Sequence, residues 1–400
     1  NFLFFYFFIF IYYYIIYSIE MVTRRHFKKS THKKQNHKHK NPSHKKPRYN
    51  KSIHKNVWEP SISIPEYWKL EFPYRDLYVS ETRLMEDFDK LKNFKPKTIK
   101  MSVPDSYRDQ KMVFVEDWNK NQELYEITDY FSQRCRAKCI FNISEDKSVL
   151  ELFTINKSKI LQSILRKRHP LTYYHIREEI FKNHKQCTNF NTTLVVSFLQ
   201  LFKPKRWLDF SAGWGDRLIG GIAYGCEYTG VDPSECQKPV YQNIINTLVE
   251  KKNRKKYQII SDGFENVKVK KGWYDLVFTS PPFFDFELYE DTKKQSTEQF
   301  KNVKAWKEDF LFPCIRKSRD SLTSEGYLAL YITDFNDSKY IDDMMKFVAD
   351  ELLDMTYLGN LYWINEGNTK KKRTVYVWQK DKEEKKSKGK EKKKLIVFKK

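Results

Sequence analysis

The sequence of 400 residues contains only six cysteines, and their spacing does not form a metal-binding pattern. Cys135 and Cys139 lie four residues apart, but no second pair has the spacing that zinc sites use. Six histidines between His26 and His54 have no cysteine among them and no regular pairing. We interpret these histidines as compositional bias and expect no metal site. The cysteines are scattered along the sequence, from which we infer a reducing compartment.

Acidic residues are absent from residues 21–55, which contain 13 lysines and arginines. Residues 380–400 contain 11 lysines and four acids. Most of the net charge of +23 therefore lies in two tails that cannot bury a core, and we expect both to be disordered. Such tails indicate solubility or nuclear import, or attraction to a polyanion, and these interpretations are compatible.

Long hydrophobic runs are scarce, and the first 17 residues form the run that needs an explanation. A membrane anchor or a signal sequence has this character. However, the run consists almost only of Phe, Tyr and Ile, which AT-rich codons favour, and it starts at Asn1 rather than at a methionine. We expect translated upstream sequence and a true start at Met21; residues 1–20 form an anchor only if they are genuine. The predicted protein is intracellular, nuclear in a eukaryote, and without a membrane partner.

Short apolar runs alternate with helical patterns after Trp207, which predicts a parallel sheet with crossover helices. The first run ends at Phe210 and is followed by a turn of small residues. In that turn Gly213 and Gly215 can take a positive φ and let a ligand approach the backbone. The helix behind them offers free N–H groups, so the turn indicates either a nucleotide-like cofactor or a plain strand-to-helix connection.

Two acids follow the next two predicted strands. Asp232 ends the strand 227–231 and stands 23 positions after Asp209, where nucleotide-binding α/β folds place an acid that binds ribose hydroxyls. The alternative role for Asp232 is to cap the following helix. Asp262 ends the strand 257–261 and is a candidate acceptor for an adenine amino group, or a plain turn residue before Gly263.

The strand 274–278 leads into Thr279 and then Ser280-Pro281-Pro282-Phe283. Two prolines fix φ and remove two N–H donors, so the loop is stiff and keeps its carbonyls free. Free acceptors can hold an –NH2 group by its hydrogens and turn the nitrogen lone pair toward an electrophile. An aromatic side chain there can stack on a flat ring; the alternative is a rigid turn that covers the sheet.

The ordered set of segments resembles class I S-adenosylmethionine-dependent methyltransferases of the amino-methylating kind, such as DNA adenine-N6 and cytosine-N4 methyltransferases. Ser280 to Phe283 is similar to their (Asp/Asn/Ser)-Pro-Pro-(Tyr/Phe) signature, and Asp232 and Asp262 match their acids after the second and third strands. The resemblance covers roughly residues 185–380. It implies S-adenosylmethionine as cofactor and transfer to an exocyclic amine or amide. The part that resembles the cofactor motif comprises Asp209, Ser211, Ala212, Gly213 and Gly215.

The sequence departs from this family in three respects. Ser280 is commonest among cytosine-N4 enzymes, whereas adenine-N6 enzymes usually carry Asp or Asn. Many serine-bearing enzymes are permuted, with the proline loop before the glycine turn, but here it follows. Ser211 stands where DNA methyltransferases often have phenylalanine, and Trp214 fills the middle of the G-x-G.

The sequence therefore predicts a Rossmann-like α/β methyltransferase with a mostly parallel sheet, a terminal antiparallel hairpin and an N-terminal α-rich accessory region. A helix is expected over 298–322 and a hairpin turn at Gly367-Asn368. No large recognition domain follows the proline loop, so the accessory region or a partner protein is expected to recognise the target. The expected parts of the chain are 1–20, a basic tail at 21–58, the accessory region at 59–165, the methyltransferase domain at 166–380 and a lysine-rich tail at 381–400.

Two helices are predicted inside the accessory region. Ser80 can cap a helix with Leu84, Met85, Phe88 and Leu91 on one face. Thr128 or Asp129 can start another, with Arg134 and Arg136 exposed.

The predicted activity is methyl transfer to an exocyclic amine of a nucleic-acid base, in DNA before RNA. Catalysis would rest on positioning by the proline loop. The alternatives are an RNA base methyltransferase, a catalytically silent binding subunit that keeps the fold, and a protein amide methyltransferase.

Overall fold

The computed structural model describes residues 61–101, 111–116, 118–141, 146–284, 287–289, 296–334, 338–365 and 368–382. The predicted segments 1–20 and 21–58 and nearly all of 381–400 lie outside these residues. All described residues belong to one compact unit, Lys55–Lys400. Within the described ranges, no helix combines the length and the apolar character that crossing a membrane requires.

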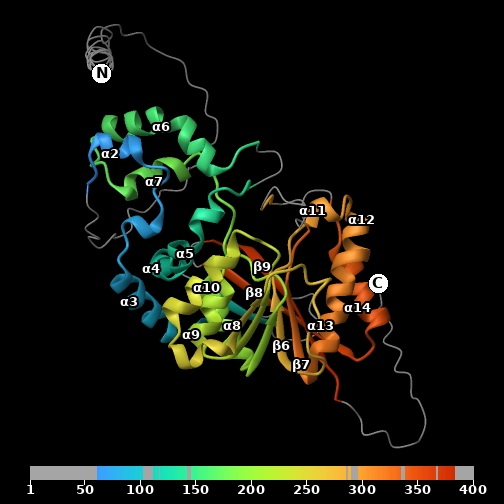
Figure 1. The fold of residues 1–400 in the computed structure, drawn as a ribbon. Helices are drawn as coiled ribbons and strands as arrows, with labels where there is room; N and C mark the ends of the chain where they lie inside the picture. Colours follow the sequence, from blue (N-terminus) through green and yellow to red (C-terminus); the bar gives the residue numbers. More distant parts are fainter. Residues whose placement is uncertain are drawn as a thin grey trace, which may run out of the picture. The chain divides into compact units, whose positions relative to one another are not determined.

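A sheet of nine strands organises the described part of the chain (Figure 1). The strands are β1 Lys97–Met101, β2 Lys111–Glu116, β3 Arg206–Asp209, β4 Glu227–Val231, β5 Tyr257–Ile260, β6 Tyr274–Thr279, β7 Leu322–Tyr331, β8 Met355–Asn365 and β9 Asn368–Lys380. Their order is β1-β2-β8-β9-β7-β6-β3-β4-β5. Of these, β5, β4, β3, β6 and β7 run parallel, and β9 pairs antiparallel with both β7 and β8. The predicted mostly parallel sheet with a terminal antiparallel hairpin is confirmed; Gly367 of the expected turn lies outside the described residues.

The chain reverses its direction of winding between β3 and β6, which are neighbours in the sheet. From β3 the chain proceeds outward to β4 and β5, and from β6 it proceeds the other way to β7. Open α/β sheets bind ligands at such a switch point, outside the carboxyl ends of the strands. The turn after β3 and the loop after β6 are the two segments that the sequence singled out.

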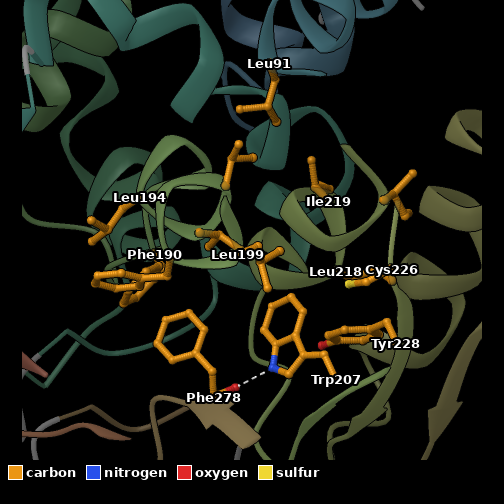
Figure 2. Packing of buried hydrophobic residues seen from close by; sticks show 14 of the residues in the cluster. Leu91, Phe190, Leu194, Leu199, Trp207, Leu218, Ile219, Cys226, Tyr228 and Phe278 are labelled. Carbon is orange, nitrogen blue, oxygen red and sulfur yellow. Dashed lines mark hydrogen bonds between the residues drawn. The ribbon is translucent and has the colours of Figure 1, made fainter. Parts of the chain in front are cut away.

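Helices cover both faces of the sheet, with α8, α9 and α10 on one face and α13 and α14 on the other (Figure 1). Side chains of a strand alternate between faces, so Trp207 packs on the first face and Leu208 on the second. Figure 2 shows the first face, where the Trp207 indole Nε1 donates to the Phe278 carbonyl at 2.8 Å. The helices of this part of the chain are α8 Thr192–Phe202, α9 Asp216–Tyr224, α10 Gln237–Leu248, η2 Lys251–Lys256, α11 Ser296–Gln299, α12 Val303–Ala305, η3 Trp306–Leu311, α13 Phe312–Ser321 and α14 Ile341–Glu351.

The helix expected over 298–322 begins later than predicted: after a break at residues 300–302, helical structure is continuous from Val303 to Ser321 through α12, η3 and α13. Asn302 starts a new helix, because its side chain accepts from the Ala305 N–H at 2.9 Å. Pro313 lacks an N–H and lies in the first turn of α13, directly after the π-helical segment η3. A proline cannot donate the backbone bond that a continuous α-helix needs at that point.

The accessory region is rich in helices, as predicted, and its own apolar cluster is built by α2, α6 and α7. Ser80 caps α3 as expected, and Leu84, Phe88 and Leu91 are buried on one face of that helix. Its strand β2 extends the sheet by pairing with β8. The helices of this region are α2 Ile64–Lys69, η1 Arg75–Leu77, α3 Glu81–Lys92, α4 Trp118–Tyr125, α5 Ile127–Arg136 and α6 Val149–Arg166; α7 Tyr173–Phe181, which packs with them, follows the predicted boundary at residue 165.

Arg136 is buried, which corrects the expectation that both arginines of α5 are exposed. Its guanidinium pairs with Asp129 and donates to the Cys187 carbonyl at 2.7 Å. Arg134 has an exposed side chain that pairs with Asp76, as expected for a helix surface. The partners of Arg136 include a residue 51 positions away, which no local pattern can indicate.

Four cysteines form disulfides in the described part of the chain, contrary to the reducing compartment inferred from their spacing. Cys135 pairs with Cys236 and Cys139 with Cys187, with Cα–Cα distances of 5.9 and 6.1 Å. Cys226 and Cys314 are buried and free. The paired cysteines are 101 and 48 residues apart, so they become neighbours only through the fold.

Candidate active site

A cavity of about 1150 Å³ lies at the switch point of the sheet. Both singled-out segments line it: Ser211 and Gly213 from the turn after β3, and all of Ser280 to Phe283 after β6. The accessory region also reaches it, through Tyr125, Cys135, Lys138 and Phe141. The cavity exceeds the ~300–1,000 Å³ that usually holds one small ligand, so it has room for two adjacent ones.

The turn after β3 presents backbone to the cavity. Gly213 has a φ of +62°, which a side chain would strain. Its N–H donates to the Asp232 carboxylate at 2.8 Å, so the carboxyl end of β4 holds the turn in place. The Tyr241 hydroxyl of α10 donates to the Gly213 carbonyl, which fixes the turn from a second side.

Gly215 has a packing role and does not line the cavity. Its φ is +87°, and a Cβ built on it would lie 2.6 Å from the Ile244 Cδ1 of α10. Ala212 is fully buried, and its N–H donates to the Val231 carbonyl at 2.9 Å. These two predicted cofactor residues, Ala212 and Gly215, therefore hold the turn against its neighbours, while Ser211 and Gly213 line the cavity.

Asp232 is half-buried and lines the cavity. Its carboxylate accepts from the N–H groups of Gly213 and Ser234, the second at 3.0 Å. Burial raises the pKa of Asp232 to about 6, although these two donors favour its ionised form. It does not cap α10, whose N-cap is Cys236. An acidic acceptor beside the glycine turn is the arrangement that a ribose requires.

Asp209 does not reach the cavity but joins the two segments that line it. This fully buried carboxylate accepts from Arg217 Nε and the Tyr228 hydroxyl at 2.8 Å each. It also accepts from the Thr279 hydroxyl at 2.7 Å and from the Ser211 N–H at 3.3 Å. Because Thr279 directly precedes Ser280, one carboxylate holds both the glycine turn and the start of the proline loop.

Asp262 turns away from the cavity and accepts from the Gly263 N–H at 2.8 Å and the Asn266 amide at 3.3 Å. Its neighbours Gly263, Phe264 and Glu265 line the cavity instead. The Glu265 Oε2 is buried and has no partner within the described structure. Sequence reasoning did not single out Glu265, because it follows the end of β5 by five positions, whereas Asp262 follows it by two.

Gln237 is a second cavity residue that the sequence did not reveal. It is the first residue of α10 and is 1% exposed, yet neither polar atom of its amide has a partner among the described residues. Buried amides are normally paired. Gln237 and Glu265 line the cavity together with Asp232, and their unpaired polar atoms fit a polar ligand there.

The proline loop lines the other part of the cavity. Pro281 is buried, while Ser280, Pro282 and Phe283 are half-buried. The Phe283 ring lies 5.8 Å from the Tyr331 ring at the end of β7. Behind it, the Phe190 ring lies 5.3 Å from Tyr331. Phe283 therefore stands in a group of rings, the environment that a planar acceptor needs for stacking.

Two buried carboxyl groups in the cavity wall have altered acidity. Burial raises the pKa of Asp216 to about 6 against the opposing effect of Arg217, which pairs with its Oδ1 at 3.6 Å; this oxygen has no hydrogen-bond partner among the described residues. Burial also raises the pKa of Glu287, which accepts from the Thr188 N–H and hydroxyl at 2.8 and 2.9 Å. Perturbed acids in a cleft are typical of functional sites.

Neither a protein-family model nor a curated protein matches the sequence. Solved structures with a similar fold include TrmN from Thermus thermophilus, at 13% identity and a TM-score of 0.34. That match covers 48% of this chain and 49% of TrmN, so the chain spans about half the length of that protein. An rRNA methylase from Streptococcus thermophilus matches at 16% identity over 49% of this chain and 99% of its own, with a TM-score of 0.33.

A third similar structure is 1,6-didemethyltoxoflavin-N1-methyltransferase from Burkholderia thailandensis, which was crystallised with 1,6-didemethyltoxoflavin and S-adenosylhomocysteine. It has 10% identity and a TM-score of 0.34, and the match covers 57% of this chain and 90% of its own.

Proposed function

We propose that the protein is an S-adenosylmethionine-dependent methyltransferase that methylates an exocyclic amine of a nucleic-acid base, in DNA before RNA. The observation that carries the proposal is that the glycine turn and the Ser-Pro-Pro-Phe loop line one cavity at the neighbouring ends of β3 and β6. A cofactor turn and an amine-binding loop have to face each other for direct transfer between their ligands.

The residues around the glycine turn fit the cofactor. Asp232 would accept from the ribose hydroxyls, and Gly213 would let the cofactor lie close to the backbone. The unpaired Glu265 Oε2 is an acceptor for the adenine amino group, a role that the sequence alone had given to Asp262. When bound, the cofactor supplies an electrophilic methyl group on a sulfonium.

The proline loop supplies the acceptor side. The Ser280 hydroxyl and the Pro281 carbonyl would accept from the amine hydrogens, which directs the nitrogen lone pair toward the methyl group. Pro282 restricts the residue before it and so keeps that carbonyl aimed. Phe283 would stack on the base, and in duplex DNA the base must first be flipped out, which costs a few kcal/mol. Positioning thus supplies most of the catalysis.

The direct test is mass spectrometry of nucleosides after the purified protein has been incubated with isotope-labelled cofactor and a mixture of DNA and RNA. Label in N6-methyladenine or N4-methylcytosine from DNA is the expected result. Label only in RNA nucleosides would favour the RNA alternative. Label only in added protein, or in nothing while the cofactor still binds, would overturn the proposal in favour of an amide methyltransferase or a silent subunit.

The loop itself is tested by Pro282→Ala in single-turnover methyl transfer, with cofactor affinity measured in parallel. Loosening the loop should slow transfer by up to about a hundredfold, because a misplacement of about 1 Å can cost that much. Cofactor affinity should not change, since the glycine turn belongs to another strand. A variant that transfers like the wild type would mean that the loop is only a rigid turn.

A further inference from the structure

A wall of rings continues from the proline loop across the end of the sheet. Its members beyond Phe283 are Tyr331, Trp363 and Arg373, all of which line the cavity. The Tyr331 and Trp363 ring centroids are 6.4 Å apart, and the Arg373 guanidinium carbon lies 4.0 Å above the Trp363 ring. We call these three residues the β8–β9 wall, although Tyr331 is the last residue of the neighbouring strand β7.

The sheet itself fixes the geometry of the β8–β9 wall. Trp363 of β8 lies directly opposite Arg373 of β9, and Tyr331 of β7 lies opposite Val375. Residues 373 and 375 are two positions apart on one strand, so they share a face. The positions of the indole and the guanidinium thus follow from the register of three paired strands, which is a more rigid support than a loop.

The chemistry of the β8–β9 wall suits a nucleotide better than an isolated amine. An arginine stacked on an indole still presents N–H donors in its own plane, in the fork that matches phosphate oxygens. Aromatic faces beside it suit the flat face of a base. In the sequence, Lys370, Lys371 and Lys372 directly precede Arg373.

We propose that Arg373 binds the phosphate next to the target nucleotide, while Trp363 and Tyr331 support the unstacked base or its neighbour beside Phe283. This inference rests on the proposed function and narrows it. The acceptor is then a nucleic-acid strand that carries a phosphodiester beside the methylated base, rather than a free base, a nucleoside or a protein amide.

The test uses single-stranded oligonucleotides of the methylated sequence and the variants Arg373→Gln and Arg373→Lys. Arg373→Gln should weaken oligonucleotide binding by about tenfold, as expected for one charge-assisted contact. It should also reduce the slope of log affinity against log salt by about 1. Arg373→Lys should restore the slope and only part of the affinity, because lysine keeps the charge but lacks the planar fork.

Arg316→Gln provides the matched control. Arg316 of α13 also lies over an aromatic ring, 5.1 Å above Phe347, and it pairs with Glu351 of α14; neither residue lines the cavity. Its substitution removes the same charge and a similar stacking contact, but at a place outside the cavity wall. It should therefore leave both the oligonucleotide affinity and the salt slope unchanged within about twofold.

Neutral methylphosphonate linkages locate the contact. One such linkage is placed in turn on either side of the target nucleotide. At one of the two positions it should weaken oligonucleotide binding by the wild type. At that same position it should not weaken binding by Arg373→Gln any further. A purely structural role of Arg373 in the hairpin would not produce this coupling. Equal losses for both proteins at every position, or a wild-type salt slope in Arg373→Gln, would overturn the inference.

The two proposals fail in different ways. If the wild type methylates nucleic acid and Arg373→Gln does so with the same affinity and salt dependence, only the β8–β9 wall is assigned wrongly. If the wild type methylates no nucleic acid at all, the proposed function itself is overturned.

Discussion

The two walls of the cavity, a cofactor wall at the glycine turn and an acceptor wall at the proline loop, are built in different ways. The cofactor wall is held by hydrogen bonds, in which Asp232 accepts from Gly213 and Ser234, within about twenty residues of chain. The acceptor wall is held by ring contacts between Phe190, Phe283, Tyr331 and Trp363, which come from distant parts of the sequence. Hydrogen bonds select defined groups, whereas aromatic faces accept many flat ones. Under the proposed function, the site would therefore specify its cofactor more narrowly than its acceptor.

The largest effect is expected where the two walls meet. Asp209→Asn should reduce the free energy of unfolding by about 3–5 kcal/mol, because it removes the nearer of the two carboxylates that pair with the buried Arg217 and leaves only Asp216, at 3.6 Å. Denaturant unfolding measures this loss, and both cofactor binding and methyl transfer should suffer. Thr279→Val removes only one donor to the same carboxylate and should cost about 1–3 kcal/mol. Equal stability of Asp209→Asn and the wild type would mean that the walls are not joined there.

One of the two disulfides, Cys135–Cys236, connects the accessory region to the cofactor wall, so breaking it should loosen that wall. Cys135 of α5 is bonded to Cys236, four positions after Asp232. Removing either disulfide by Cys→Ala substitution should cost about 2–4 kcal/mol of unfolding free energy. Only the loss of Cys135–Cys236 should also weaken cofactor binding, because both of its cysteines line the cavity. Cys226→Ala, at a buried free thiol, is the control for the loss of sulfur alone; similar stability in all three variants would contradict the prediction.

A smaller effect is expected from the ribose acceptor. Asp232→Ala should weaken S-adenosylmethionine binding by about 1.5–3 kcal/mol, the value of a charge-assisted hydrogen bond. Calorimetry on the wild type and on Asp232→Ala measures this loss of cofactor affinity, and identical affinities would exclude the ribose role.

The pH dependence sharpens this prediction. The pKa of Asp232 is raised to about 6, so cofactor affinity should fall as the pH drops below 6 and the carboxylate becomes protonated. The raised pKa should affect the folding stability of the ligand-free protein in the opposite direction from the cofactor affinity. A carboxyl with a raised pKa binds its proton more readily in the folded state than in the unfolded one, so its contribution to stability decreases as the pH rises from about 4 to 6. Asp232→Asn should flatten both profiles.

The smallest effect is expected on the acceptor wall, where several rings share the contact. Phe283→Ala should weaken acceptor binding by about 1–3 kcal/mol, the usual value of one base-stacking surface. Cofactor affinity should stay constant, and Phe283→Tyr should retain acceptor binding. A variant that lost cofactor affinity as well would show that the two walls are less separate than their contacts indicate.

Local patterns were enough to predict the parallel sheet and the two turns at its switch point. Short apolar runs followed by the Gly213 turn or by Pro281-Pro282 are signals within a few residues, and the cap at Ser80 is another. Partners from distant segments were not predictable. Arg136 is buried by Asp129 and the Cys187 carbonyl, the disulfides span 48 and 101 residues, and the β8–β9 wall depends on strand register. The lysine run before Arg373 was the available signal for that wall, and it was not used.

The shared carboxylate of Asp209 has a thermodynamic consequence. One group holds both the Ser211 N–H of the glycine turn and the Thr279 hydroxyl before the proline loop. If cofactor binding tightens the turn through this group, it also changes the affinity of the loop for its acceptor. Linkage then requires the acceptor to strengthen cofactor binding by the same factor. That cooperativity factor, measured by titrating each ligand in the presence and absence of the other, should approach one in Asp209→Asn.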